Sequence, residues 1–246
     1  MKIQETKNDF ERVEELTRER IAKRKHKRMG NLFMHMIVCS SLIIILITVA
    51  AVVLKSSAAE SPDDTEETIS ETKCVVAPPK YREQLLPVNE YSRPGTTLAE
   101  VKWIVIHYTG NTGKNAQQNY SYFEGLAESG QTYASSHFIV GLGGEIIQCV
   151  PLDEIAYASN ERNVDTISIE CCIDNEEGHF NEKTYDSLVH LTAWLMGEYD
   201  VPVKDVIRHY DVTGKNCPKY FVEHKSAWED FKLDLEAYIE QNGTEK

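Results

Sequence analysis

Three side chains suited to metal or nucleophilic chemistry lie within one short segment, residues 207–218 (IRHYDVTGKNCP). His209 offers a neutral imidazole, Cys217 a thiol and Lys215 an amine. Imidazole nitrogen and thiolate sulfur are ligands that zinc prefers, and a catalytic zinc takes three protein ligands and leaves a fourth position for water. If His209 and Cys217 are two of the three ligands, the third must come from elsewhere in the chain.

Two other histidines are candidates for the third ligand. His107 ends an apolar run and directly precedes a Gly/Asn loop, and sites on α/β sheets commonly lie where strands end. His137 lies near the start of a predicted hairpin. Spacing alone leaves the choice between them open. Exposed or capping roles account for three further histidines, which fall in a polar loop or on predicted helices: His179, His190 and His224.

The elements that must position these residues include several predicted strands. Val101–Tyr108 is a nearly continuous apolar run, as expected of a central strand buried on both faces. Thr166–Cys172 alternates between apolar and polar residues, which places Glu170 on its polar face. Val206–Val212 is predicted to be another strand, and it leads into the segment with His209.

A hairpin and three helices complete the expected domain. Ser136–Leu142 and Glu145–Val150 are strand-like runs joined through two glycines, which predicts a tight hairpin. Apolar residues recur at helical spacing in three segments, Ala116–Glu128, Lys183–Tyr199 and Ser226–Gln241. Strands that alternate with helices predict an α/β fold, a mixed central β-sheet flanked by helices. We expect this domain to span residues 86–242.

Three segments are expected to precede the domain. Residues 1–31 form a basic tail whose Lys/Arg cluster favours the cytoplasmic side of a membrane. Residues 32–54 carry no Asp, Glu, Lys or Arg and would extend about 34 Å as a helix, enough to cross a bilayer. Residues 55–85 have the composition of an acidic, disordered linker.

The apolar segment 32–54 has a second interpretation, a cleaved signal peptide, because small residues follow it at Ser56–Ala59. The segment is longer than a usual signal core and begins late, which favours an uncleaved anchor. The sequence therefore predicts a single-pass membrane protein in which one transmembrane helix precedes the folded domain. The N-terminus would be cytoplasmic and the folded domain outside.

The charge distribution argues against one class of partner. The formal net charge is −13, and much of the positive charge lies in the first 28 residues, so the rest of the chain is strongly acidic. Sequence-independent nucleic-acid binding needs many contacts between Lys or Arg and phosphate. No nucleic-acid partner is expected.

Four cysteines remain outside the apolar segment and the candidate metal ligands. They allow three disulfide connectivities, between which the sequence does not choose. Cys171 and Cys172 are adjacent and point to opposite faces of a strand, so no bridge between them is expected. Buried free thiols are predicted for Cys149 and Cys171, and the state of Cys74 stays open.

Four separated motifs resemble the type-2 N-acetylmuramoyl-L-alanine amidases, a family that includes phage amidase-type lysozymes and is similar to the peptidoglycan-recognition proteins. The motifs occur in the family's order, within roughly residues 95–240. They are residues 103–111 (WIVIHYTGN), 136–151 (SHFIVGLGGEIIQCVP), 166–170 (TISIE) and 209–218 (HYDVTGKNCP).

The resemblance implies a zinc enzyme that cuts peptidoglycan at the amide between the lactyl group of N-acetylmuramic acid and L-alanine. His107, His209 and Cys217 match the family's zinc ligands. Glu170 matches the glutamate that some bacterial members use as general base, and Lys215 matches a catalytic lysine that supplies positive charge for the oxyanion. An outside-facing domain of this kind would work on the cell-wall side of the membrane.

Two residues of the motifs are expected beside the site without binding the metal. His137 matches a family histidine that is not a ligand and either adjoins the ligands or is simply packed. Asn111 ends the first motif, where it would adjoin the ligands or face the substrate.

The chain departs from the family pattern in two places. Ser136 stands where the phage enzymes have a catalytic tyrosine, which gives Glu170 more weight as the proton carrier. Residues 156–158 (AYA) replace a segment that often holds a substrate-facing histidine, so the preference for glycan or peptide stays open.

Two other functions remain as alternatives. One is a membrane-tethered peptidoglycan receptor without turnover, against which the complete His/His/Cys set argues, since purely binding relatives often lose the cysteine. The other is a thiol hydrolase with Cys217 as nucleophile and His209 as base. Pro218 beside the cysteine and the need for His107 make it the weaker interpretation.

Overall fold

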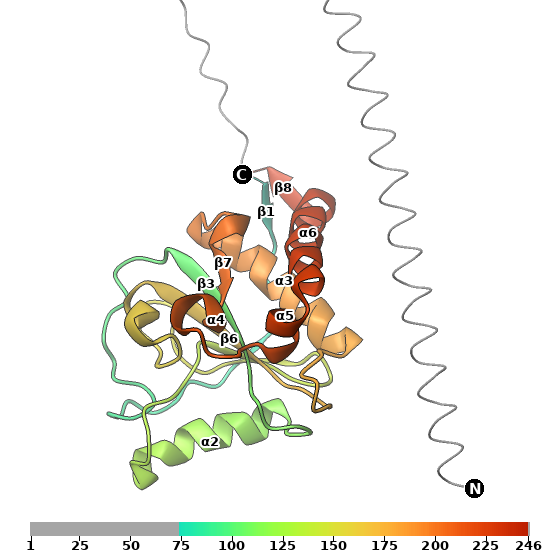
Figure 1. Cartoon of the computed structure of the whole chain (residues 1–246). Coiled ribbons are helices and arrows are strands. Elements are labelled where there is room, and N and C mark those ends of the chain that lie inside the picture. The colour runs from blue at the N-terminus through green and yellow to red at the C-terminus, as the bar shows by residue number, and fades with distance from the viewer. Residues whose placement is uncertain (1–73, 246) are drawn as a thin grey trace, which may run out of the picture. The chain divides into compact units, whose positions relative to one another are not determined.

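The computed structural model of the protein describes residues 74–245 (Figure 1). The predicted basic tail, the apolar segment 32–54 and most of the predicted linker lie outside the described residues. Within residues 74–245, no helix combines the length and the apolar character needed to span a bilayer.

A six-stranded mixed sheet forms the centre of the domain, as the sequence predicts. Its strand order is β2-β5-β4-β6-β3-β7, and all neighbours are parallel except β4 and β5, which form the predicted hairpin. The strands are β2 (Arg82–Glu83), β3 (Trp103–Tyr108), β4 (Phe138–Val140), β5 (Ile146–Gln148), β6 (Thr166–Cys171) and β7 (Val206–Arg208).

Strand β3 lies between β6 and β7 and sets the register of the functional residues. His107 on β3 pairs with Glu170 on β6, and Ile106 pairs with Arg208, the last residue of β7. Residues paired across neighbouring strands project to the same face of a sheet, so His107 and Glu170 share one face. The next residue after β7 is His209, which brings it level with His107.

Helices cover both faces of the sheet (Figure 1). On one face α2 (Ala116–Ser129) packs against β4 and β5 in an apolar cluster that includes Ile139 and Ile147. On the other face α3 (Glu182–Tyr199), α5 (Lys219–Glu223) and α6 (Lys225–Asn242) pack over Ile104, Ile106, Ile167 and Ile169. All three predicted helices are confirmed. Because Glu170 pairs with Ile139, His107 and Glu170 lie on the face that carries α2.

The predicted strand Val206–Val212 is wrong beyond Arg208. The chain turns there into the short helix α4 (His209–Thr213), which ends at Gly214 with φ of 78°. The carboxylate of Asp211 accepts a hydrogen bond from the backbone N–H of Arg208 and satisfies a donor at the start of the helix. The apolar spacing of the segment carries no information about this cap, which decides between strand and helix.

Folded residues extend beyond the predicted boundaries of the domain, 86 and 242. Strand β1 (Cys74–Val76) pairs antiparallel with β8 (Gly243–Glu245) in a separate two-stranded sheet, and β2 joins the edge of the central sheet. Val76 is buried, and Tyr81 packs against Phe138 and Trp194. Residues 74–85 are therefore folded although their composition is typical of a linker. Pairing with distant strands satisfies the hydrogen-bonding groups of their backbone.

The described cysteines are all free. Cys149 and Cys171 are buried thiols, as predicted. Cys172 is also buried and shares an apolar cluster with Cys149, whereas Cys171 belongs to the cluster on the other face. Cys74 is free and exposed on β1.

The correction at the N-terminal boundary can be tested by replacing Tyr81 with Ala. We expect the free energy of unfolding to fall by about 2–3 kcal/mol, because the change removes two aromatic contacts to the core. Denaturant unfolding measures the loss. Lys80→Ala, at an exposed neighbour, is the control and should change stability little. Equal stabilities of the two variants would contradict the assignment of residues 74–85 to the folded domain.

Candidate metal centre

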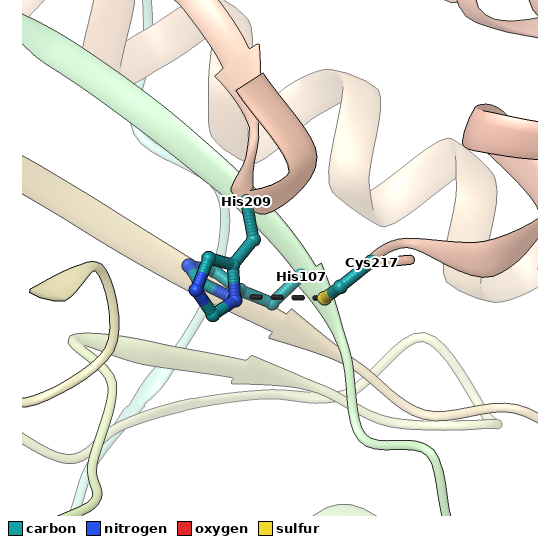
Figure 2. A group of neighbouring side chains, drawn as sticks. All are labelled: His107, His209 and Cys217. Carbon is teal, nitrogen blue, oxygen red and sulfur yellow. Dashed lines mark hydrogen bonds between the residues drawn. The ribbon is translucent and has the colours of Figure 1, made fainter. Parts of the chain in front are cut away.

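Three buried side chains converge at the carboxyl ends of β3 and β7 (Figure 2). Nδ1 of His107 lies 3.1 Å from Nδ1 of His209 and 3.9 Å from Sγ of Cys217. The ligand atoms of the three residues all lie within 4.8 Å of one another. The structure thus brings His107, and not His137, together with His209 and Cys217.

Local structure explains how each of the three residues reaches this point. His107 lies near the end of β3, and His209 is the first residue of α4, directly after the neighbouring parallel strand. Cys217 returns from the turn at Gly214, and its carbonyl accepts a hydrogen bond from the backbone N–H of Tyr210 at 2.9 Å. The closed turn between α4 and α5 therefore holds the thiol against the two imidazoles.

Two of the donor–donor distances are near those expected around a tetrahedral zinc ion. With Zn–N near 2.05 Å and Zn–S near 2.3 Å, two ligand nitrogens lie about 3.3 Å apart and a nitrogen and a sulfur about 3.6 Å apart. The observed 3.1 and 3.9 Å are close to these values. Two imidazoles and a thiolate are also the donor types that zinc prefers.

The protonation of the three side chains also suits a bound cation. Burial, the neighbouring His209 and the charge of Lys215 lower the pKa of His107, and burial with Lys215 lowers the pKa of His209 to about 4. Both imidazoles are therefore neutral at pH 7 and keep a lone pair for a cation. Burial and the charge of Glu170 raise the pKa of Cys217 to about 12, so its thiolate needs a bound cation to form.

Glu170 brings a carboxyl group with unused hydrogen-bonding capacity. Its Oε2 atom is sealed from solvent and has no hydrogen-bond partner among the described residues. Burial raises the pKa of Glu170 to about 7, and the positive charge of Lys215 acts against this rise. A buried polar atom without a partner is costly, and such groups are found at functional sites.

Lys215 is exposed on the turn between α4 and Cys217. Its charge lowers the pKa of Glu170, of both imidazoles and of the Cys217 thiol. The ammonium group therefore acts electrostatically on every titratable member of the cluster, from a position open to solvent.

The comparison with known proteins decides the family. A model of the Amidase_2 family, described as N-acetylmuramoyl-L-alanine amidase, matches residues 97–220, just over half of the chain. The chain belongs to this family. The three converging residues, Glu170 and Lys215 all lie within the matched residues.

Individual relatives carry the same description. The amidase BlyA of Bacillus subtilis (strain 168) is 31% identical over 187 residues, which is 68% of this chain and 49% of BlyA. A probable N-acetylmuramoyl-L-alanine amidase of Bacillus licheniformis is 30% identical over 172 residues, 65% of this chain and 48% of that protein. The chain thus spans about half the length of these relatives.

A solved structure has the same fold as the amidase domain. The catalytic domain of XlyA superposes with a TM-score of 0.54 at 27% identity, and the match covers 63% of this chain and 99% of that domain. The mixed sheet with flanking helices is therefore the amidase fold.

The sequence motifs miss two polar residues that touch the ligands. Oγ of Ser159 lies 3.3 Å from Nε2 of His107, and Oδ1 of Asn160 lies 3.3 Å from Nε2 of His209. Both belong to the connection around the 3₁₀ helix η1 (Asn160–Val164), between β5 and β6. The sequence gives only a weak sign of this turn. Residue 160 is Asn, which adopts the left-handed conformation found there more readily than most residues.

His137 is packed and does not belong to the converging group. The backbone N–H of Ser168 donates to its Nδ1, and its Nε2 donates to the carbonyl of Glu154, both at 3.0 Å. Burial lowers its pKa to about 4, so the ring is neutral. Both ring nitrogens are used within the protein core, which leaves neither of them free for a cation.

Asn111 and Ser136 also have structural contacts. The exposed Asn111 donates from Nδ2 to Oδ1 of Asn119 on α2, at 2.9 Å. Ser136 is fully buried, and its hydroxyl donates to the carbonyl of Phe138. A role of Asn111 toward substrate stays a prediction, whereas the Ser136 hydroxyl is already engaged in the core.

Replacing His137 with Leu tests its packed role in this amidase domain. The backbone N–H of Ser168 and the carbonyl of Glu154 would lose their partners in the core, so we expect a loss of about 2–4 kcal/mol in the free energy of unfolding. Denaturant unfolding of the metal-free protein measures it. The same change at exposed His224 is the control and should cost little. An unchanged stability with lost metal binding would instead make His137 part of the centre.

Proposed function

We propose that the chain is a zinc-dependent N-acetylmuramoyl-L-alanine amidase, which hydrolyses the amide between the lactyl group of N-acetylmuramic acid and L-alanine of the peptidoglycan stem peptide. The observation that carries the proposal is the buried convergence of His107, His209 and Cys217, with the unpartnered carboxyl of Glu170 on the adjacent strand. The family membership supports the substrate.

The proposed metal ligands are His107 and His209, each through Nδ1, and Cys217 through Sγ. A zinc ion held there supplies Lewis-acid polarisation of a carbonyl and acidifies a water molecule. The chain contributes neutral imidazoles and a thiol shielded from solvent, so the donor set needs to release only one proton to bind the ion.

Glu170 is proposed as the group that moves the proton. Its carboxyl lies on the same face as His107, and Oε2 has an unused position for a hydrogen bond. The carboxylate would accept a proton from the attacking water and pass it to the amine of L-alanine as the C–N bond breaks. Burial favours the protonated form of Glu170, which donates the proton. The charge of Lys215 and of a bound metal ion would favour the ionised form, which accepts it.

Lys215 is proposed to stabilise the negative charge that develops on the carbonyl oxygen. Its ammonium group acts on the whole cluster from the solvent side of the turn, where a substrate would enter. A fixed positive charge aimed at developing charge stabilises the transition state more than the ground state.

The proposed location is the cell-wall side of a membrane, with residues 32–54 as a single-pass anchor. This part of the proposal rests on the charge-free apolar segment and the Lys/Arg cluster before it. The partner of the domain would then be the peptidoglycan facing the membrane.

Incubation of the purified protein with cell wall tests the activity. In zinc-replete buffer we expect new L-alanine amino termini, and after removal of the metal by a chelator their release should stop. Cys217→Ala should abolish release and reduce zinc content, because one of three ligands is lost.

Other outcomes would favour the alternatives. Wall binding by the zinc-loaded protein without release of amino termini would identify a non-catalytic peptidoglycan receptor. Release that survives thorough metal removal and is lost in Cys217→Ala would identify a thiol hydrolase.

Glu170→Gln tests the proton carrier separately from the metal. We expect the turnover rate to fall by about 10²- to 10⁴-fold, since the amide cannot accept the proton, while zinc content stays that of the wild type. Glu177→Gln, an exposed glutamate on the loop before α3, is the matched control. Turnover within a few-fold of the wild type in Glu170→Gln would assign the proton transfer to another group.

A further inference from the structure

We propose that Ser159 and Asn160 act together as positioning residues that orient the two histidine ligands for the cation. The inference deepens the proposed function and rests on the metal site proposed above. It concerns a connection, residues 158–163, that none of the four sequence motifs includes.

One oxygen of each residue meets the outer nitrogen of one imidazole. Ser159 Oγ lies 3.3 Å from Nε2 of His107, and Asn160 Oδ1 lies 3.3 Å from Nε2 of His209. The Nδ1 atoms of the same rings face each other at 3.1 Å, beside the sulfur of Cys217. Figure 2 shows the two rings and the thiol converging from separate segments. Each ring is therefore held on the side opposite to the donor set.

A hydrogen-bond acceptor beside Nε2 favours the tautomer with the proton on Nε2. A histidine that binds a metal ion through Nδ1 needs this tautomer. A neutral imidazole carries one N–H, and its other nitrogen offers the lone pair. The amide oxygen of Asn160 can only accept, so it favours the proton on Nε2 of His209 and leaves Nδ1 free for the cation. The Ser159 hydroxyl, which can both donate and accept, is proposed to accept from His107 in the same way. Partners of this kind change metal affinity by about 10- to 100-fold.

The backbone that presents the two oxygens is itself fixed. Oδ1 of Asn163 accepts hydrogen bonds from the backbone N–H groups of Ala158 and Ser159, at 3.0 and 2.6 Å. Ser159 is fully buried, and Asn160 has φ of 52°, in the left-handed region. The turn thus presents two acceptors from adjacent residues, at an angle that an ordinary extended segment would not give.

The same turn is tied to the sheet side of the site. The backbone N–H of Ser135 donates to the carbonyl of Tyr157 at 3.0 Å, and the backbone N–H of Tyr157 donates to Oγ of Ser135 at 2.9 Å. Ser135 lies shortly before β4, so the positioning turn is also anchored on the hairpin, in addition to its contacts with α4 and β6. It can therefore restrain the rings relative to the rest of the sheet.

Zinc affinity of the full chain, purified in detergent and stripped of metal, tests the proposal by competition with a chromophoric chelator. Asn160→Gly keeps the left-handed backbone and removes only the amide, and Ser159→Ala removes only the hydroxyl. Each is expected to weaken zinc binding about 10- to 100-fold. Asn160→Asp keeps an acceptor oxygen and should bind zinc within a few-fold of the wild type.

Controls separate orientation from general stability. Glu161→Ala, at an exposed residue of the same turn, should leave zinc affinity unchanged. Thermal unfolding of metal-free Asn160→Gly should match that of the wild type, and the visible absorption of the cobalt(II)-substituted variant should shift as the ring relaxes. Because Asn160 is exposed, this variant keeps the test valid if Ser159→Ala unfolds.

Two outcomes would overturn the inference, and they can be told apart. If the wild type binds zinc tightly and both Asn160→Gly and Ser159→Ala bind it equally tightly, the positioning role is wrong and the metal site stands. If the wild type itself binds no zinc, the metal site of the proposed function fails and the positioning role fails with it.

Discussion

The parallel pairing of β3 with β6 on one side and β7 on the other is the constraint on which the site depends. Register alone brings His107 opposite Glu170 and leaves His209 as the first residue beyond the neighbouring strand. No long side chain has to reach across the molecule. Parallel strands end at a common edge, so residues far apart in the chain meet there without a dedicated loop for each. Only Cys217 needs a turn of its own, and the cap of α4 together with the bond from Tyr210 to the Cys217 carbonyl provides it.

The two faces of the sheet differ in composition: one is packed with apolar side chains, and the other carries the polar residues of the candidate site. The face under α3 and α6 is filled by aliphatic and aromatic side chains from every strand that it covers. The face under α2 gives up part of its apolar packing to His107, Ser168 and Glu170. A buried carboxylate oxygen without a hydrogen-bond partner, such as Oε2 of Glu170, destabilises a fold, whereas the apolar packing on the opposite face stabilises it. This division explains why a strand as buried as β6 still carries a glutamate near its end.

Local patterns predict the regular elements of this domain well, and the site less well. The apolar run that ends at His107, the glycine-linked hairpin and the three amphipathic helices follow from periodicity, which reports burial. Spacing left two candidates for the third ligand, and the family resemblance pointed to His107. Two features depend on contacts between distant segments, the pairing of residues 74–76 with 243–245 and the approach of Ser159 and Asn160 to the imidazoles. The helix that begins at His209 depends instead on a local cap by Asp211, which the apolar spacing does not reveal.

The antiparallel pairing of β1 with β8 also determines where the two ends of the described chain lie. Cys74 lies opposite Glu245, so the described chain enters and leaves the fold at one spot. Both strands pack by α3 and α6, on the face away from His107 and Glu170. The two ends of the described chain therefore lie together on the side of the sheet opposite to the face that carries His107 and Glu170. A chain segment that continues from either end starts away from that face.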